Sequence, residues 1–257
     1  MKQPRTKKDL ILKGEDYFLP QLSVDCVIFG FHEGVLKVLL IRLAPLPQWG
    51  LVGGFILKEE NPDAAAHRIL KERTGLDEIF LQFLQVFGNP DRTKTDTWPV
   101  LIGKLGVKAG TNNWLLKRFV SLGYYALVDF HEVTPGTDGS FESCVWFDIH
   151  EIPALLFDHR EILDQALETL QLHLNYHPVG YNLLPVSFTM PELQRLYETI
   201  LDKKLDRRNF QRKILSFGIL RRLKEKRKGV AHKAPYLYSF DLRKYNKALK
   251  EGLGGGW

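Results

Sequence analysis

The stretch GFILKEENPDAAAHRILKERTGL (54–76) decides how the first half of the chain folds. It begins inside WGLVGGFI (49–56), a mostly apolar run that predicts a strand interrupted at Gly53-Gly54. Asn61-Pro62 then pairs a good N-cap residue with proline at the first helical position. Small and apolar side chains follow at helical spacing as far as Gly75, where the helix is expected to stop. The sequence therefore predicts a strand, a loop and a capped helix in succession.

Apolar runs on either side predict a sheet flanked by helices. SVDCVIFGF (23–31) and VLKVLLIRL (35–43) are typical of two strands, and the short link His32-Glu33-Gly34 resembles a hairpin loop. Further strands are expected at 83–87, 118–130 and 142–149, and a closing helix at 158–174. The polar stretch 91–117, which carries Trp98 and Trp114, predicts a long loop, and such loops are usually functional or mobile.

A second, smaller domain follows the linker-like segment HPVGYNLLP. Thr189 and Glu192 have the spacing of a capping box, and Asp206 is a good N-cap for a second helix that stops at Gly218. ILRRL, a basic loop and YLYSF then predict a hairpin with a long tip, which completes the order of a winged helix-turn-helix. The expected division is a polar N-terminal arm (1–20), a first domain (21–176), a linker (177–187), the winged helix-turn-helix (188–241) and a tail (242–257) with a disordered end, EGLGGGW.

Charge is distributed unevenly between these domains. The 257 residues carry a net charge of +6, yet Lys203–Lys233 alone holds thirteen Lys or Arg against two acids, a net charge of +11. The remaining chain holds 23 basic and 28 acidic residues, a net charge of −5. This asymmetry predicts that the C-terminal domain binds a polyanion.

The sequence shows no apolar run of 18 residues and no secretion signal, so we expect a cytoplasmic protein without a membrane partner. Its two cysteines, Cys26 and Cys144, lie in apolar strand-like segments and are expected to be buried free thiols. A disulfide or a metal pair is the alternative.

The second helix of the basic domain has two contrasting faces. Phe210, Ile214 and Phe217 share one side, and Arg208, Gln211 and Arg212 lie on the other. Arginine pairs bidentately with guanine and glutamine with adenine, so this face is expected to read duplex DNA while the wing meets phosphates. The residues expected at DNA are Arg207, Arg208, Asn209, Gln211, Arg212, Lys213, Lys226, Arg227 and Lys228. The alternatives are a solvated basic face, or a surface for RNA or acidic proteins.

The stretch from Gly54 to Leu76 resembles the Nudix box, G-x5-E-x7-R-E-U-x-E-E-x-G-U, where U is bulky and aliphatic. Seven of its nine fixed positions match: Gly54, Glu60, Arg68, Leu70, Glu72, Gly75 and Leu76. In active Nudix proteins the glutamates of this helix bind divalent cations, which take oxygen ligands. Here Ile69 and Arg73 stand at two of those positions. We therefore expect a degenerate box with no catalytic residues, no metal and no cofactor.

A fold of this kind places a ligand cleft beside the box. Its expected lining is Arg42, Trp49, the Gly53-Gly54 backbone and Arg92, because guanidinium, indole and open backbone suit phosphate, base and ribose. Each has a routine alternative as a surface arginine, a core tryptophan or a turn glycine.

The two halves together resemble the Nudix-related transcriptional regulators, which join a catalytically degenerate Nudix domain to a C-terminal winged helix. The matching segments are SVDCVIFGF, WGLVGGF, the degenerate box, FGNPDR, GYYALV, FDHREIL, NLLP, FTMPELQRLYETIL and DRRNFQRK. The resemblance implies an α/β Nudix fold, a mixed sheet flanked by helices, followed by a small winged helix-turn-helix domain. In place of the short link of these relatives, this chain inserts about 25 residues around Trp98 and Trp114.

The resemblance also implies a homodimer that regulates NAD or sugar metabolism. Its implied partners are a double-stranded DNA operator and a small-molecule effector, either an ADP-ribose-like nucleotide or a sugar. Two other functions stay open. One is an active Nudix hydrolase of nucleoside diphosphate derivatives such as ADP-ribose, using acids outside the box such as Asp148 or Glu151. The other is an RNA-linked binding protein.

Overall fold

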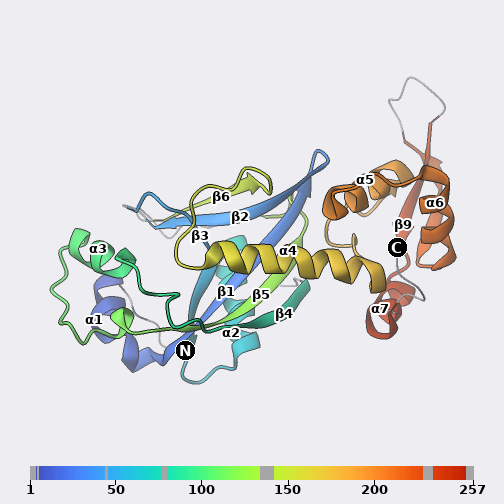
Figure 1. Ribbon diagram of the computed structural model, residues 1–257. Helices are drawn as coiled ribbons and strands as arrows, with labels where there is room; N and C mark the ends of the chain where they lie inside the picture. Colours follow the sequence, from blue (N-terminus) through green and yellow to red (C-terminus); the bar gives the residue numbers. More distant parts are fainter. Residues whose placement is uncertain are drawn as a thin grey trace. The chain divides into compact units, whose positions relative to one another are not determined.

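The computed structural model describes residues 4, 6–43, 46–76, 80–133, 142–227 and 234–252. It contains two compact units (Figure 1). The first comprises residues 1–29, 38–126 and 132–166, and the second comprises 30–37, 127–131 and 167–257. No helix among the described residues is long and apolar enough to cross a membrane. Cys26 and Cys144 do not form a disulfide; Cys26 is buried as expected, whereas Cys144 is only half-buried.

The first unit is built on a six-stranded sheet in the order β4-β5-β1-β3-β2-β6, with β1 and β2 also paired. The strands are β1 (Phe18–His32), β2 (Val35–Leu43), β3 (Gly50–Leu57), β4 (Phe80–Phe87), β5 (Val120–Val128) and β6 (Glu142–Asp148). β1 and β3 are antiparallel, and their register sets Asp25 opposite Gly53. Strand β3 runs through Gly53-Gly54 without the expected interruption. In the β1–β2 turn, Glu33 and Gly34 both have positive φ, as tight hairpin turns require.

Two helices flank this sheet. Helix α2 (Pro62–Thr74) begins at Asn61, whose side chain accepts a hydrogen bond from the N–H of Ala64, and ends at Gly75 in the left-handed conformation. Helix α4 (His159–Tyr176) starts in the first unit and continues into the second. Figure 1 shows α4 in front of the sheet and α2 behind it. The expected capped helix after β3 is thus confirmed at both ends.

The expected loop at 91–117 contains helix α3 (Thr97–Lys104) and a short 3-10 helix (Trp114–Leu116). The expected polar arm contains helix α1 (Lys7–Tyr17), which is capped by Thr6. The prediction of a long loop was therefore wrong for part of 91–117, whereas the polar arm was predicted without an assigned secondary structure. Apolar side chains of the two segments pack together in a common cluster, which offsets the entropy of ordering them.

The described part of the second unit contains three helices of its own, the C-terminal part of α4 and a small sheet. Helix α5 (Met190–Leu201) has the predicted capping box, and α6 (Arg207–Ser216) is capped by Asp206. Strands β8 (Leu220–Lys226) and β9 (Tyr236–Phe240) form the predicted hairpin, and β7 (Phe188–Thr189) extends it to the order β7-β9-β8. The segment expected as a tail instead forms α7 (Leu242–Glu251), because Tyr245 is buried and its hydroxyl donates to the Pro178 carbonyl at 2.9 Å. The end of the predicted tail, 253–257, lies outside the described residues.

Candidate functional site

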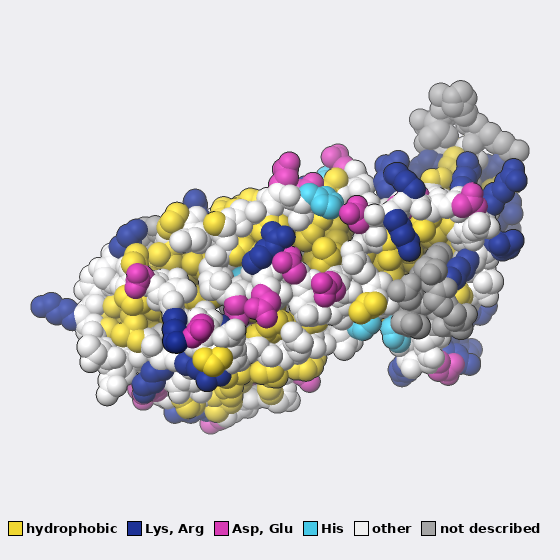
Figure 2. All heavy atoms as spheres, viewed as in Figure 1, with side chains coloured by type: hydrophobic (Ala, Val, Ile, Leu, Met, Phe, Trp, Pro, Cys, Tyr) yellow, Lys and Arg dark blue, Asp and Glu magenta, His cyan; other side chains and the backbone are white. Residues whose placement is uncertain are grey.

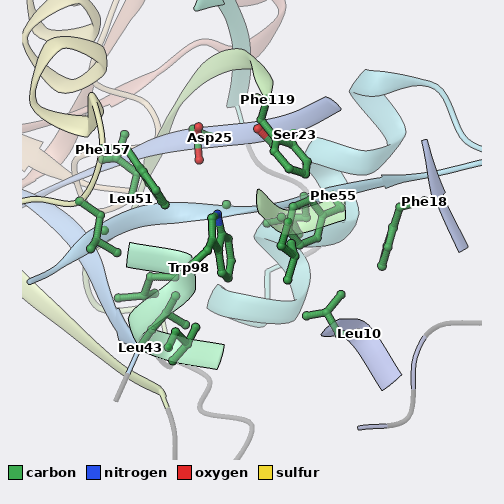
Figure 3. A pocket seen from close by; sticks show the side chains of 18 of the residues that line it. Leu10, Phe18, Ser23, Asp25, Leu43, Leu51, Phe55, Trp98, Phe119 and Phe157 are labelled. Carbon is green, nitrogen blue, oxygen red and sulfur yellow. The ribbon is translucent and has the colours of Figure 1, made fainter. Parts of the chain in front are cut away.

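A cleft with a volume of about 320 Å³ opens in the first unit, at the lower end of the range for ligand sites. Strands β1, β2 and β3 and helix α2 provide one side of it. Helices α1 and α3 provide apolar side chains on the other (Figure 3). The sequence stretch that begins at Gly54 therefore lines a cavity.

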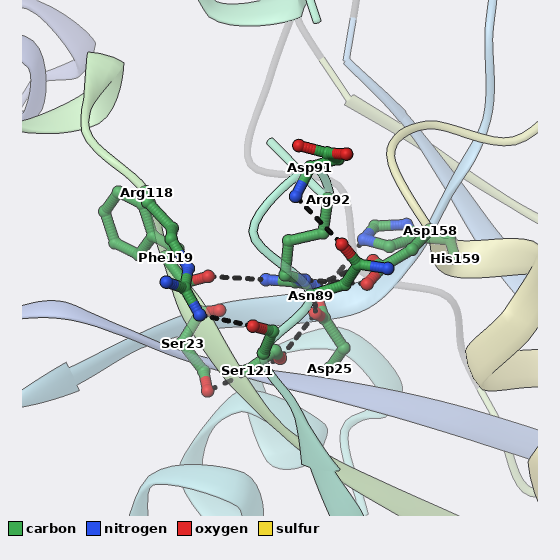
Figure 4. Close-up of polar contacts among 11 residues, drawn as sticks. Ser23, Asp25, Asn89, Asp91, Arg92, Arg118, Phe119, Ser121, Asp158 and His159 are labelled. Atoms are coloured by element: carbon green, nitrogen blue, oxygen red, sulfur yellow. Dashed lines mark hydrogen bonds and ion pairs between the residues drawn. The ribbon is translucent and has the colours of Figure 1, made fainter. Parts of the chain in front are cut away.

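A buried polar network lies at the β1 side of the cleft (Figure 4). The guanidinium of Arg92 donates to both oxygens of Asp158, at 2.7 and 2.8 Å, and to Asp25 at 3.3 Å. Ser121 donates to the same carboxylate of Asp25 at 2.5 Å. The side chain of Arg92 is only 3% exposed, so desolvation would be costly without these partners.

His159 completes this network. Its Nδ1 accepts the N–H of Leu51 at 2.9 Å, and its Nε2 lies 3.5 Å from Asp25. Burial lowers the pKa of His159 below its ordinary value and outweighs the opposing effect of the two neighbouring aspartates. A Cβ at Gly53 would lie 2.5 Å from Oδ1 of Asp25, so glycine is required for this approach.

The Nudix-box residues hold one another in place. Glu60 accepts two hydrogen bonds from Arg68, at 2.6 and 3.1 Å, and one from the N–H of Leu57 at 2.8 Å. Arg68 also donates to the Phe55 carbonyl at 2.9 Å and approaches Glu72 at 3.4 Å. Burial alone would raise the pKa of Glu60, but the Arg68 and Leu57 hydrogen bonds lower it. Glu60 is therefore a structural carboxylate with its oxygens already engaged.

The two departures from the box have different environments. Ile69 is 2% exposed, and a Cβ at Gly54 would lie 3.0 Å from its Cδ1, so this isoleucine packs on the glycine backbone. Arg73 lines the cleft together with Glu72. No group of three or more His, Cys, Asp or Glu placed to hold a metal ion occurs within the described ranges.

The expected ligand residues divide into two sets. Gly53, Gly54 and Arg92 line the cleft, although Arg92 is committed to its two aspartates. The cleft lining does not include Arg42 or Trp49, which pair with each other at 5.2 Å from guanidinium carbon to ring centroid. It also does not include Asp148 or Glu151, the acids considered for a hydrolase.

A basic face lies on the second unit. Arg207, Arg208, Asn209 and Arg212 are exposed on α6, while Phe210 is buried beneath them. Gln211 and Lys213 are half-buried. Figure 2 shows Lys and Arg side chains gathered over this unit, on the side of α6 and β9. Four of the six expected residues of α6 are therefore accessible to a partner.

The wing residues differ in their contacts. Lys226 lies 4.8 Å above the ring of Tyr236, whereas Arg227 forms an ion pair with Glu192 of the α5 capping box. Lys228 lies outside the described residues.

Comparisons with known proteins agree with this division. The NUDIX domain model matches residues 19–170, and the NrtR DNA-binding winged helix domain model matches residues 180–240. The ADPR responsive transcriptional repressor NtrR of Acinetobacter baylyi is 31% identical over 239 residues, 90% of this chain and 86% of that protein. The chain belongs to the Nudix-related transcriptional regulators. This membership confirms the expected fold class.

Solved structures of this regulator family extend the likeness to the whole architecture. The crystal structure of Shewanella oneidensis NrtR complexed with a 27mer DNA matches at a TM-score of 0.71 and 26% identity, covering 92% of this regulator and 99% of that chain. The similarity to a hydrolase covers less of the chain. The RNA pyrophosphohydrolase of Cereibacter sphaeroides is 29% identical over 136 residues, 51% of this chain and 78% of that protein.

Reasoning from single residues missed most of the polar network of the regulator. Asp25, Ser121 and the adjacent pair Asp158-His159 come from three separate segments, and their side chains meet only in the fold. The sequence signals for three of these residues are the family-matching segments SVDCVIFGF, which contains Asp25, and FDHREIL, which contains Asp158 and His159.

Proposed function

We propose that this protein is an ADP-ribose-responsive, DNA-binding transcriptional repressor that acts in the cytoplasm. The observation that carries the proposal is the pairing of two features. One is a Nudix cleft in which the described residues form no cluster of three or more potential metal ligands, and the other is a winged helix that exposes arginines. The 31% identity to a repressor described as ADPR responsive supports the choice of effector. In this proposal residues 21–176 sense the ligand together with α1, which also lines the cleft, while 177–187 link and 188–241 bind DNA.

The exposed face of α6 is proposed to read the major groove. Arg208 and Arg212 present planar guanidinium groups that can pair with guanine, and Gln211 can pair with adenine. Arg207, Lys213 and the wing residues Lys226 and Lys228 would neutralise backbone phosphates and make binding depend on salt. Arg227 is assigned a different role, because its ion pair with Glu192 fastens the wing to α5.

The cleft is proposed to bind without hydrolysing. Diphosphate cleavage in this fold needs several carboxylates for divalent cations. Here Ile69 is buried against Gly54, Arg73 presents a fixed positive charge, and Glu60 is engaged by Arg68. The remaining donors of the box do not fit a magnesium site, so we derive no catalytic step through a metal.

A route from effector to DNA is available along the first hairpin. Strand β1 carries the cleft residue Asp25 and ends at the β1–β2 turn. At that turn the Gly34 carbonyl accepts a hydrogen bond from Thr199 of α5 at 3.0 Å. A shift of β1 on ligand binding would therefore bear on the helix that packs beside α6. In a homodimer, such a shift would change the spacing of the two recognition helices on the operator.

Two measurements on the full chain test the proposal. Selection from a random duplex library should yield a defined motif, and gel shifts on that motif should show that ADP-ribose changes the affinity. Failure to select a duplex motif, or equal binding of single strands, would overturn the DNA-binding proposal. The same preparation should release no AMP from ADP-ribose with magnesium, since turnover of about 1–10³ per second would establish the hydrolase instead.

A further inference from the structure

One wall of the cleft is a cap made of α1 and the segment 97–117. Helix α3 and its C-cap residue Leu105 place Trp98, Leu101 and Leu105 at spacings of three and four residues, and all three line the cleft. The opposite wall comes from the sheet, with Leu43, Leu51 and Phe55 among its apolar residues (Figure 3). The cap therefore provides much of the apolar surface that a ligand would meet.

This cap is fastened to the rest of the unit. The indole N–H of Trp114 donates to the Leu10 carbonyl at 3.0 Å, and the side chain of Asn113 donates to the Ile11 carbonyl at 2.6 Å. A Cβ at Gly14 would overlap the ring of Trp114, so the indole lies directly on the backbone of α1. Trp114 is thus a packing residue, and it differs in this respect from Trp98.

Trp98 is only half-buried and projects from α3 into the cleft (Figure 3). Its ring centroid lies 6.4 Å from that of Phe55 and 6.1 Å from that of Phe157. The corresponding interplanar angles of 36° and 34° are tilted and not stacked. A flat ligand ring can therefore pack against the indole among aromatic neighbours that already line the same space.

Two cationic side chains, Lys7 and Arg73, also line the cleft, besides Arg68, which is already engaged by Glu60. A pocket that combines aromatic faces with cationic groups suits a ligand that joins a flat ring to phosphates. A free sugar would leave much of the aromatic surface without a partner. The lining therefore favours a nucleotide over a sugar.

We propose that Trp98 is the specificity-determining residue of the effector cleft and stacks on the base of the bound nucleotide. The inference rests on the proposed function, because it concerns the same effector. It assigns recognition of the base to the cap, and recognition of the phosphates to the cationic side chains of α1 and α2.

Titration calorimetry of the full chain with ADP-ribose and with ribose 5-phosphate tests the assignment. Trp98→Ala should weaken ADP-ribose binding about 5- to 150-fold, the range for removing one base–aromatic stack, and should leave ribose 5-phosphate binding unchanged. Trp98→Phe keeps an aromatic ring and should retain most of the affinity. ADP-ribose should quench tryptophan emission in the natural protein and much less in Trp98→Phe.

The outcomes separate the two proposals. If the natural protein binds no ADP-ribose, the proposed function fails and this inference fails with it. If the natural protein binds ADP-ribose and Trp98→Ala binds it equally well, only the assignment of Trp98 is overturned. Equal loss for both ligands would also overturn it, because Trp98 would then merely support the cap. Should Trp98→Ala fail to fold, undiminished quenching in Trp98→Phe would be the overturning result.

Discussion

Helices α2 and α6 both begin at an Asn or Asp N-cap and both carry arginines, yet they use them in opposite ways. In α2 the side chain of Arg68 is 20% exposed and bonds to Glu60 and to the Phe55 carbonyl. In α6, Arg207, Arg208 and Arg212 are exposed. An arginine committed to buried partners stabilises the fold, whereas an exposed one can bind a polyanion.

The largest expected effect in this comparison is on stability. Arg68→Ala removes the partner of Glu60, whose side chain is 3% exposed, and should lower the free energy of unfolding by about 3–5 kcal/mol. Urea denaturation followed by tryptophan fluorescence measures it, because Trp49, Trp98, Trp114 and Trp146 all lie in the first unit. The matched control, Arg212→Ala on α6, should change stability by less than about 0.5 kcal/mol. An equal loss of unfolding free energy in Arg68→Ala and Arg212→Ala would mean that the arginine of α2 does not stabilise the fold more than the arginine of α6.

The next effect is on DNA affinity. Arg208→Ala with Arg212→Ala should weaken binding to the selected duplex by about 2–6 kcal/mol, since each base-reading arginine contributes about 1–3 kcal/mol. The midpoint of urea denaturation should stay unchanged, because both side chains are exposed. Gel shifts over a protein titration give the affinity. Unchanged binding by the double variant would mean that α6 does not read the groove.

Two helical glycines, one packed against a buried ring and one facing open space, should respond in opposite ways to substitution by alanine. Gly14→Ala in α1 should destabilise the first unit by about 1–3 kcal/mol, because its methyl group would overlap the buried ring of Trp114. Gly103→Ala in α3 meets open space and should stabilise by about 0.5–1 kcal/mol, the ordinary gain of alanine in a helix. Thermal melts of the two variants should therefore shift in opposite directions. A gain in both would show that Trp114 is not held against α1.

Elements that depend on local sequence patterns could be predicted from the sequence alone, whereas elements held by distant residues could not. The N-cap at Asn61, the capping box of Thr189 and Glu192, and the two faces of α6 are local patterns, and the structure has all of them. Helix α1 has a local N-cap at Thr6, but the rest of its sequence gives no comparable signal. Its residues are mostly polar, and it is held in place by Trp114, about a hundred residues away along the chain.

The candidate site also combines residues that a local motif predicts with residues whose partners are distant in sequence. Gly53 and Gly54 were placed at the cleft by their motif, and they line it. The partners of Arg92 could not be foreseen, since Asp25 and Asp158 each lie more than 60 residues away in sequence. These ion pairs engage the guanidinium of Arg92, and its contact with a ligand stays a prediction.

The smallest expected effect concerns proton binding by the buried network. His159 has a lowered pKa in the folded protein because of its burial, while Asp25 and Asp158 raise it and Arg92 lowers it further. The unfolded chain therefore binds a proton that the folded chain does not, so stability should fall as the pH decreases below about 6.5. One such group contributes a slope of at most about 1.4 kcal/mol per pH unit.

Urea midpoints between pH 7.5 and pH 5 give this slope for the natural protein and for His159→Gln. The variant should start less stable at pH 7.5, because the hydrogen bond to the N–H of Leu51 is disturbed, and should lose less stability on acidification. An unchanged slope would mean that His159 takes up its proton as readily when folded as when unfolded. The network around Arg92 would then be open to water, and Arg92 would no longer differ from the arginines of α6 in being shielded from solvent.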